Sequence, residues 1–90
     1  MVNARKFKPF EYECSLLKFM VDNERILYIL ARNGLINTKT IRNYHISRDI
    51  YKHCYLEKRK QLLIFKRKAD EFGLSTNMVY RIWSKYQQPI

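Results

Sequence analysis

Hydrophobic residues in the first third of the chain recur at helical spacing. After Pro9, the apolar positions 10, 14, 17 and 21 lie four, three and four residues apart, which places them on one face of a helix. Asp22 or Asn23 can cap a further helix over residues 24–32, and Asn33-Gly34 is typical of a helix end. The pattern therefore predicts two helices, or one bent helix, over residues 10–33.

The stretch LINTKTIRNYHIS that follows is the least regular part of the chain. Thr38 can begin a short helix that uses Ile41 and Tyr44, but the β-branched residues leave its length open. Ser47 is an N-cap residue type, and Asp49 would then lie in the first turn, where the helix dipole favours a negative charge. We therefore expect a new helix to begin at Ser47.

Apolar residues continue at helical spacing to the end of the chain. The basic stretch EKRKQ at residues 57–61 is either a break or the solvated face of one continuous helix over residues 48–72. No window shows the apolar and polar alternation of a strand. The inward positions that this pattern predicts are Ile50, Tyr51, Cys54, Tyr55, Leu62, Phe65, Ala69, Phe72, Val79 and Ile82. The fold is predicted to be all-α, a small helical bundle.

Length and charge narrow the class of protein. Ninety residues fit a single domain over residues 1–90, in which we expect the basic residues 1–8 to be flexible. The chain carries 18 Lys and Arg against 8 Asp and Glu, a formal charge of +10, and both halves are positive. A polyanion is the partner that such a charge favours.

Several classes of function find little support in the sequence. The longest apolar runs are too short to span a bilayer, and Cys14 and Cys54 lack CxxC spacing, which favours a reduced cytoplasmic protein. His53 and Cys54 are adjacent and so face different sides of a helix, which argues against zinc. No nucleophile stands at a recognisable spacing from a base. We therefore expect no membrane span, metal, cofactor or enzymatic activity.

The segment EFGLSTNMVYRIWSKY has the residues of a helix-turn-helix. Such a motif needs a small residue where the helices cross and one that tolerates positive φ in the turn, and Ala69 and Gly73 meet these needs. Ser75 can cap the second helix. Lys68 departs from the pattern, because an aliphatic residue is usual at that position.

The stretch ADEFGLSTNMVYRIWSKY at residues 69–86 resembles the helix-turn-helix of the homeodomain-like superfamily. With RDIYKHCYLEKRK upstream, residues 47–86 are similar to the C-terminal region of Mor-type phage transcription activators, although the Gly-rich and Tyr-rich insert of that family is absent. The resemblance implies a C-terminal helix-turn-helix that binds duplex DNA sequence-specifically, in a transcriptional regulator or a mobile-element accessory factor.

The outward face of the last helix follows from placing Val79 and Ile82 inward. Asn can bond adenine and Arg guanine through paired hydrogen bonds, while Thr and Tyr can touch bases or phosphates. Phosphate contacts are expected from Lys66 and Arg67, near the start of the preceding helix, and from Lys85. The base-reading candidates are Ser75, Thr76, Asn77, Tyr80, Arg81 and Ser84.

Other interpretations stay open on the sequence alone. Residues 32–46 loosely repeat the glycine pattern, either as packing support or as a second DNA-contacting unit. The apolar side chains of residues 10–33 predict a homodimer, unless they fold back over residues 41–72 to complete a monomeric core. Trp83 is expected in the core or in a dimer contact. The function could instead be that of a protein-interaction module with an acidic partner, an RNA-binding domain, or a hairpin without DNA contact.

Overall fold

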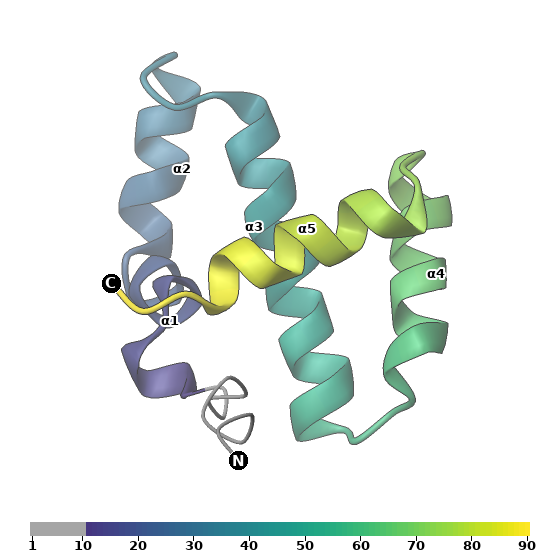
Figure 1. Ribbon diagram of the computed structural model, residues 1–90. Helices are drawn as coiled ribbons and strands as arrows, with labels where there is room; N and C mark the ends of the chain where they lie inside the picture. The colour runs from purple at the N-terminus through teal and green to yellow at the C-terminus, as the bar shows by residue number, and fades with distance from the viewer. Residues whose placement is uncertain (1–10) are drawn as a thin grey trace.

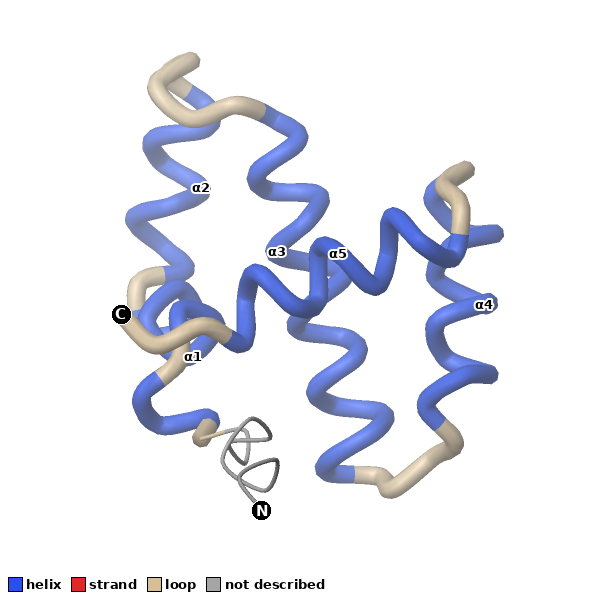
Figure 2. The backbone as a smooth tube through the Cα atoms, viewed as in Figure 1, coloured by secondary structure: helices blue, strands red, loops and turns tan. Residues whose placement is uncertain are grey.

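The computed structural model describes residues 11–90, and these residues form helices joined by short loops (Figures 1 and 2). An isolated bridge between Ser15 and Pro89 is the one β-type pairing there, so the all-α prediction is confirmed. The expected flexibility of residues 1–8 lies outside the described residues. The elements are a 3-10 turn η2 (Tyr12–Cys14), α1 (Leu16–Asp22), α2 (Glu24–Arg32), α3 (Thr38–Tyr51), a π-helical turn η3 (Lys52–Leu56), α4 (Gln61–Phe72) and α5 (Thr76–Gln87).

Helix α3 is the helix on which the others pack. It contacts α1, α2, α4 and α5, and α5 also contacts α1 and α4. Figure 1 shows α5 crossing α3, with the C-terminal end of α5 near α1 and its other end beside α4. The core joins apolar side chains from α1, α3, α4 and α5, namely Leu17, Met20, Tyr44, Ile46, Ile50, Ile64, Phe65, Ala69, Val79, Ile82, Trp83 and Tyr86.

The first α-helix begins later than the apolar spacing predicted. Ser15 has extended backbone, and its hydroxyl accepts a hydrogen bond from the Lys18 amide at 3.1 Å. This cap starts α1 at Leu16, because it satisfies an amide that has no partner within the helix. Cys14 is consequently exposed and does not belong to the predicted inward face.

The prediction of a helix that begins at Ser47 is wrong. Asn37 supplies the cap instead, because its Oδ1 accepts a hydrogen bond from the Lys39 amide at 2.7 Å, and α3 then runs unbroken for 14 residues. Ser47 is buried in the middle of α3, and its hydroxyl is the one buried side-chain polar atom without a hydrogen-bond partner in the described part of the chain. Asp49 lies near the end of the helix.

The basic stretch at residues 57–61 does break the helix. The helical path ends at Leu56, Lys58 adopts a left-handed backbone with φ 57°, and α4 begins at Gln61. The predicted inward position of Leu62 is wrong, because Leu62 lies in the first turn of α4 and the buried residues of this helix begin only at Ile64. Leu62 shares a helix face with Phe65 but is 54% exposed. Tyr55, also predicted inward, is exposed, whereas Tyr51 and Cys54 are half-buried against the core.

The segment that loosely repeats the glycine pattern contributes Tyr44 and Ile46 to the core. Gly34 ends α2 with φ 73°, and the helix behind it is α3. Helix α3 contacts four other helices, and only Thr38 and Lys39 at its start are exposed, whereas exposed residues occur along most of α5. Packing support is therefore the interpretation that the arrangement favours for residues 32–46.

Candidate nucleic-acid interface

The turn between α4 and α5 is set by Gly73. Its φ of 66° lies in the left-handed region that favours glycine. The Leu74 amide donates to the Ala69 carbonyl at 2.9 Å, and the Gly73 amide donates to the Asp70 carbonyl at 3.4 Å. These two bonds form a Schellman motif, which satisfies the last carbonyls of α4 and reverses the chain direction. The glycine at this position is as the sequence predicted.

Ser75 begins α5 as a capping residue. Its hydroxyl accepts a hydrogen bond from the Met78 amide at 3.1 Å. Val79 and Ile82 are buried, as predicted, and Trp83 lies in the core. The Tyr86 hydroxyl donates to the Thr40 carbonyl at 3.3 Å and ties the end of α5 to α3. The turn, the cap and four buried side chains therefore fix which face of α5 points outward.

Three predicted base-reading residues share that outward face. Asn77, Arg81 and Ser84 are separated by four and three residues, and all are exposed. This spacing stacks them on one side of a helix, opposite Val79 and Ile82. No ion pair engages Arg81 within residues 11–90. An amide, a guanidinium and a hydroxyl thus form one polar stripe along α5.

The other three candidates are placed differently. The Ser75 hydroxyl is engaged in the cap, and Thr76 is half-buried in the first turn of α5. The Tyr80 ring meets the Phe65 ring edge-on, with centroids 4.3 Å apart, while Tyr80 stays partly exposed. Aromatic contacts of this kind hold a ring in place. Tyr80 therefore flanks the stripe in a fixed orientation, and Ser75 and Thr76 shape the start of α5.

The predicted phosphate contacts are exposed lysine and arginine side chains. The expectation that Lys66 and Arg67 stand near the start of α4 is wrong, because they lie in the middle of this 12-residue helix, which runs from Gln61 to Phe72. Lys85 lies in the last turn of α5. In the described part of the chain none of the three forms an ion pair, so each positive charge is available to an anion.

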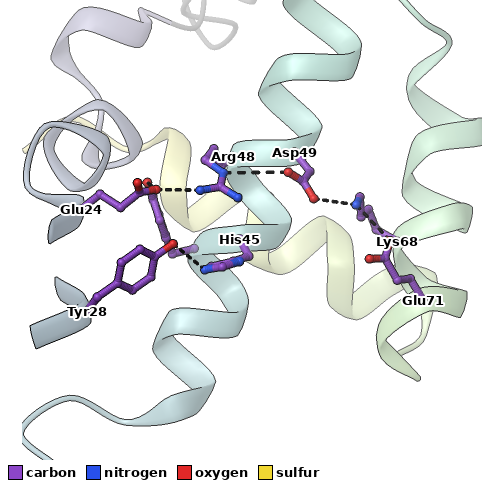
Figure 3. Close-up of polar contacts among 8 residues, drawn as sticks. Glu24, Tyr28, His45, Arg48, Asp49, Lys68 and Glu71 are labelled. Carbon is purple, nitrogen blue, oxygen red and sulfur yellow. Dashed lines mark hydrogen bonds and ion pairs between the residues drawn. The ribbon is translucent and has the colours of Figure 1, made fainter. Parts of the chain in front are cut away.

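Lys68, the residue that departs from the helix-turn-helix pattern, has a structural role. Its ammonium donates to Asp49 of α3 at 2.7 Å and to Glu71 at 3.0 Å (Figure 3). Only 6% of its side chain is exposed. Burial alone would lower the pKa of Lys68, but the hydrogen bonds to the two carboxylates outweigh it and raise that pKa. The lysine at a predicted core position was a signal for this pairing, because a buried charge requires a partner of opposite charge.

A second polar cluster joins α2 to α3. The Tyr44 hydroxyl and the Arg48 guanidinium each donate to Glu24 at 2.6 Å. These hydrogen bonds, the one from Tyr44 first, lower the pKa of Glu24. Tyr28 and His45 are also hydrogen-bonded, at 2.9 Å (Figure 3). Helix α2 thus meets α3 through polar side chains, and Arg48 lies 3.9 Å from Asp49, which continues the contact toward α4.

Comparison with models of protein families, with curated proteins and with solved structures gives no match to this chain. Within residues 11–90, no group of three or more His, Cys, Asp or Glu side chains is placed to hold a metal ion. None of the helices in that range has the length and apolar character needed to cross a membrane.

The apolar residues of the N-terminal helices divide between core and surface. Leu17 and Met20 are buried, and Leu16, Val21 and Leu27 pack against the core. These five side chains therefore contribute to the core of a single chain, which is the alternative to a dimer contact that the sequence left open. On α2, Ile26 and Ile29 stay 54% and 39% exposed, because Glu24 and Tyr28 occupy the side that faces α3.

Proposed function

We propose that the protein binds duplex DNA sequence-specifically, with α4 and α5 acting as a helix-turn-helix and α5 entering the major groove. The supporting observation is the exposed stripe of Asn77, Arg81 and Ser84 on a helix whose other face is locked by the core. A fixed helix that presents amide and guanidinium groups suits base reading in the major groove.

The charge of the chain supports the same proposal. The formal charge is +10, and Lys66, Arg67 and Lys85 flank or precede the stripe without ion pairs among residues 11–90. Phosphate contacts position a protein on the duplex, while base contacts specify the sequence. We assign these three residues to positioning. The proposed role is that of a transcriptional regulator or a mobile-element accessory factor in the cytoplasm, and it includes no catalytic step.

The decisive experiment measures affinity by fluorescence anisotropy for random duplex DNA, single-stranded DNA and RNA over a salt series. We expect duplex DNA to bind best, with log affinity falling linearly in log salt concentration because cations are released from the phosphates. Selection of binding sites from random duplexes should then return one sequence motif. Absent or salt-insensitive binding at low ionic strength would reject a nucleic-acid function, and a preference for RNA would favour the RNA-binding alternative.

A homodimer is part of the proposal, and α2 is the surface that supports it. Ile26 and Ile29 are exposed neighbours one turn apart, and a single helix-turn-helix reads few base pairs, so a second copy on an adjacent half-site would add selectivity. Sedimentation equilibrium with cognate DNA should give a dimer mass. Ile26→Ser/Ile29→Ser should return a folded monomer, and a wild-type monomer mass on DNA would contradict the dimer while leaving DNA binding intact.

A further inference from the structure

Two neighbouring leucines on α4 face solvent. Leu62 and Leu63 are each 54% exposed, although they lie directly before the buried pair Ile64 and Phe65. They line a shallow hollow of about 330 Å³ together with Lys60 and Lys66. Exposed leucines that gather around a hollow are a common feature of protein-interaction surfaces.

The charge around this hollow is positive and uncompensated. Neither Lys60 nor Lys66 forms an ion pair with any residue in the range 11–90. Nearby carboxylates are engaged elsewhere, since Glu57 bonds His53 at 3.0 Å and Glu71 bonds Lys68. Asp70 stands one turn after Lys66 and makes no ion pair with it. Two ammonium groups therefore flank an apolar floor without an acidic partner from the described chain.

We propose that this hollow, which we call the leucine hollow, is a docking site for an acidic amphipathic helix of another protein. An apolar side chain of that helix would cover Leu62 and Leu63, and carboxylates beside it would meet Lys60 and Lys66. The docking mode is that of a helix laid into a groove, with charge complementarity at the rim.

The observations favour this occupant over three others. In a symmetric contact of two copies at this hollow, Lys60 and Lys66 would face the same lysines of the second copy, and like charges repel. Nucleic acid would meet the lysines but has no aliphatic group to cover two leucines. An anionic membrane would need a broader apolar face than two side chains provide. An acidic helix matches both the leucines and the lysines.

The test uses a fluorescein-labelled helical peptide with leucines on one face and glutamates beside them, and a companion in which glutamine replaces each glutamate. We expect the full chain to bind the acidic peptide and to bind the companion about tenfold more weakly. Leu62→Ser/Leu63→Ser and Lys60→Glu should each lower the affinity for the acidic peptide by about tenfold. The matched controls, Leu35→Ser and Lys52→Glu, change exposed residues outside the leucine hollow and should leave the affinity for the acidic peptide unchanged.

Amide chemical-shift mapping locates the peptide, and the shifts should centre on residues 60–66. The proposal fails if the acidic peptide does not bind at low salt, if both peptides bind alike, or if the leucine variant binds as the wild type does. It also fails if anionic vesicles bind through the leucines while the peptide does not. Duplex DNA is measured separately with Leu62→Ser/Leu63→Ser, which should retain wild-type DNA affinity, so failure here is distinguishable from failure of the proposed DNA function.

Discussion

At the scale of single residues, the face that a side chain occupies decides its role. Asn77 and Arg81 stand one turn apart on the outward face of α5, while Lys68 is drawn inward by two carboxylates. Both Arg81 and Lys68 are long cationic side chains on helical segments. Arg81 is exposed and is therefore a candidate for base recognition, whereas Lys68 is buried and joins α4 to α3 through Asp49.

Removing a base-reading side chain should relax sequence selectivity. Arg81→Ala or Asn77→Ala should cost about 1–3 kcal/mol of binding free energy on the preferred sequence, because one paired hydrogen bond is lost. Lys66→Ala, the control, should lower the affinity for all duplexes by the same factor. Competition anisotropy with preferred and random duplexes measures both effects. An unchanged selected motif in Arg81→Ala and Asn77→Ala would show that α5 does not read bases.

Lys68→Met should destabilise the fold, because it leaves the half-buried Asp49 carboxylate without its main partner. We expect a loss of about 1–3 kcal/mol in the free energy of unfolding, less than for a fully buried pair since Asp49 and Glu71 keep access to solvent. Urea denaturation of Lys68→Met, Asp49→Asn and the double variant gives the coupling energy. Additive effects would mean that the ion pair does not join α3 to α4 energetically.

At the scale of elements, caps and turns determine where helices start and stop. Asn37 and Ser75 each begin a helix by accepting a hydrogen bond from a backbone amide of its first turn. Gly34 and Gly73 each end one in a left-handed conformation, and the amide of the residue after each glycine donates to a carbonyl five residues earlier. The same device thus closes α2 and α4, but only the turn after α4 orients the helix that we propose to read DNA.

The two glycines allow a matched experiment on that turn. Gly73→Val and Gly34→Val should each lose about 1–2 kcal/mol or more of stability, because each places a β-branched residue at positive φ, while a Cβ at either position meets no atom within 4 Å. Among molecules that remain folded, Gly73→Val should reduce DNA affinity and Gly34→Val should not. Wild-type stability of Gly73→Val in urea would contradict the role of the turn.

At the scale of the whole molecule, polar contacts run across the helices beside the apolar core. Glu24 on α2 meets Arg48 on α3, and Asp49 on α3 meets Lys68 on α4. These contacts stabilise the relative positions of three helices. Because carboxylates accept these hydrogen bonds, the free energy of unfolding should change when the pH is lowered enough to protonate them.

The lowered pKa of Glu24 predicts the direction in which stability changes with pH. A carboxylate whose pKa is lower in the folded state stabilises the fold above its unfolded pKa of about 4.3, and this contribution is lost as pH falls through the folded pKa. Glu24→Gln should therefore lose less stability on acidification than the wild type. Urea denaturation from neutral to acid pH, with Glu11→Gln as an exposed control, measures it. Parallel curves for wild type and Glu24→Gln would contradict the assignment.

The sequence by itself determined the features that depend on neighbouring residues. The helical class, the stop at Gly34, the turn at Gly73, the cap at Ser75 and the inward positions of Val79 and Ile82 are all confirmed. Each follows from hydrogen bonds, φ preferences or helical spacing among residues close together in the sequence, and these do not depend on the rest of the fold. The charge of +10 is likewise a property of composition alone.

Only the tertiary structure decided the features that depend on distant partners. Ser47 has the residue type of a cap, yet it is buried because α3 is surrounded by four helices. Lys68 pairs with Asp49, nineteen positions earlier, and Leu62 is exposed because the buried part of α4 begins only at Ile64. Spacing along the chain fixes which residues share a helix face, but packing between helices chooses which face is buried and which is left for a partner.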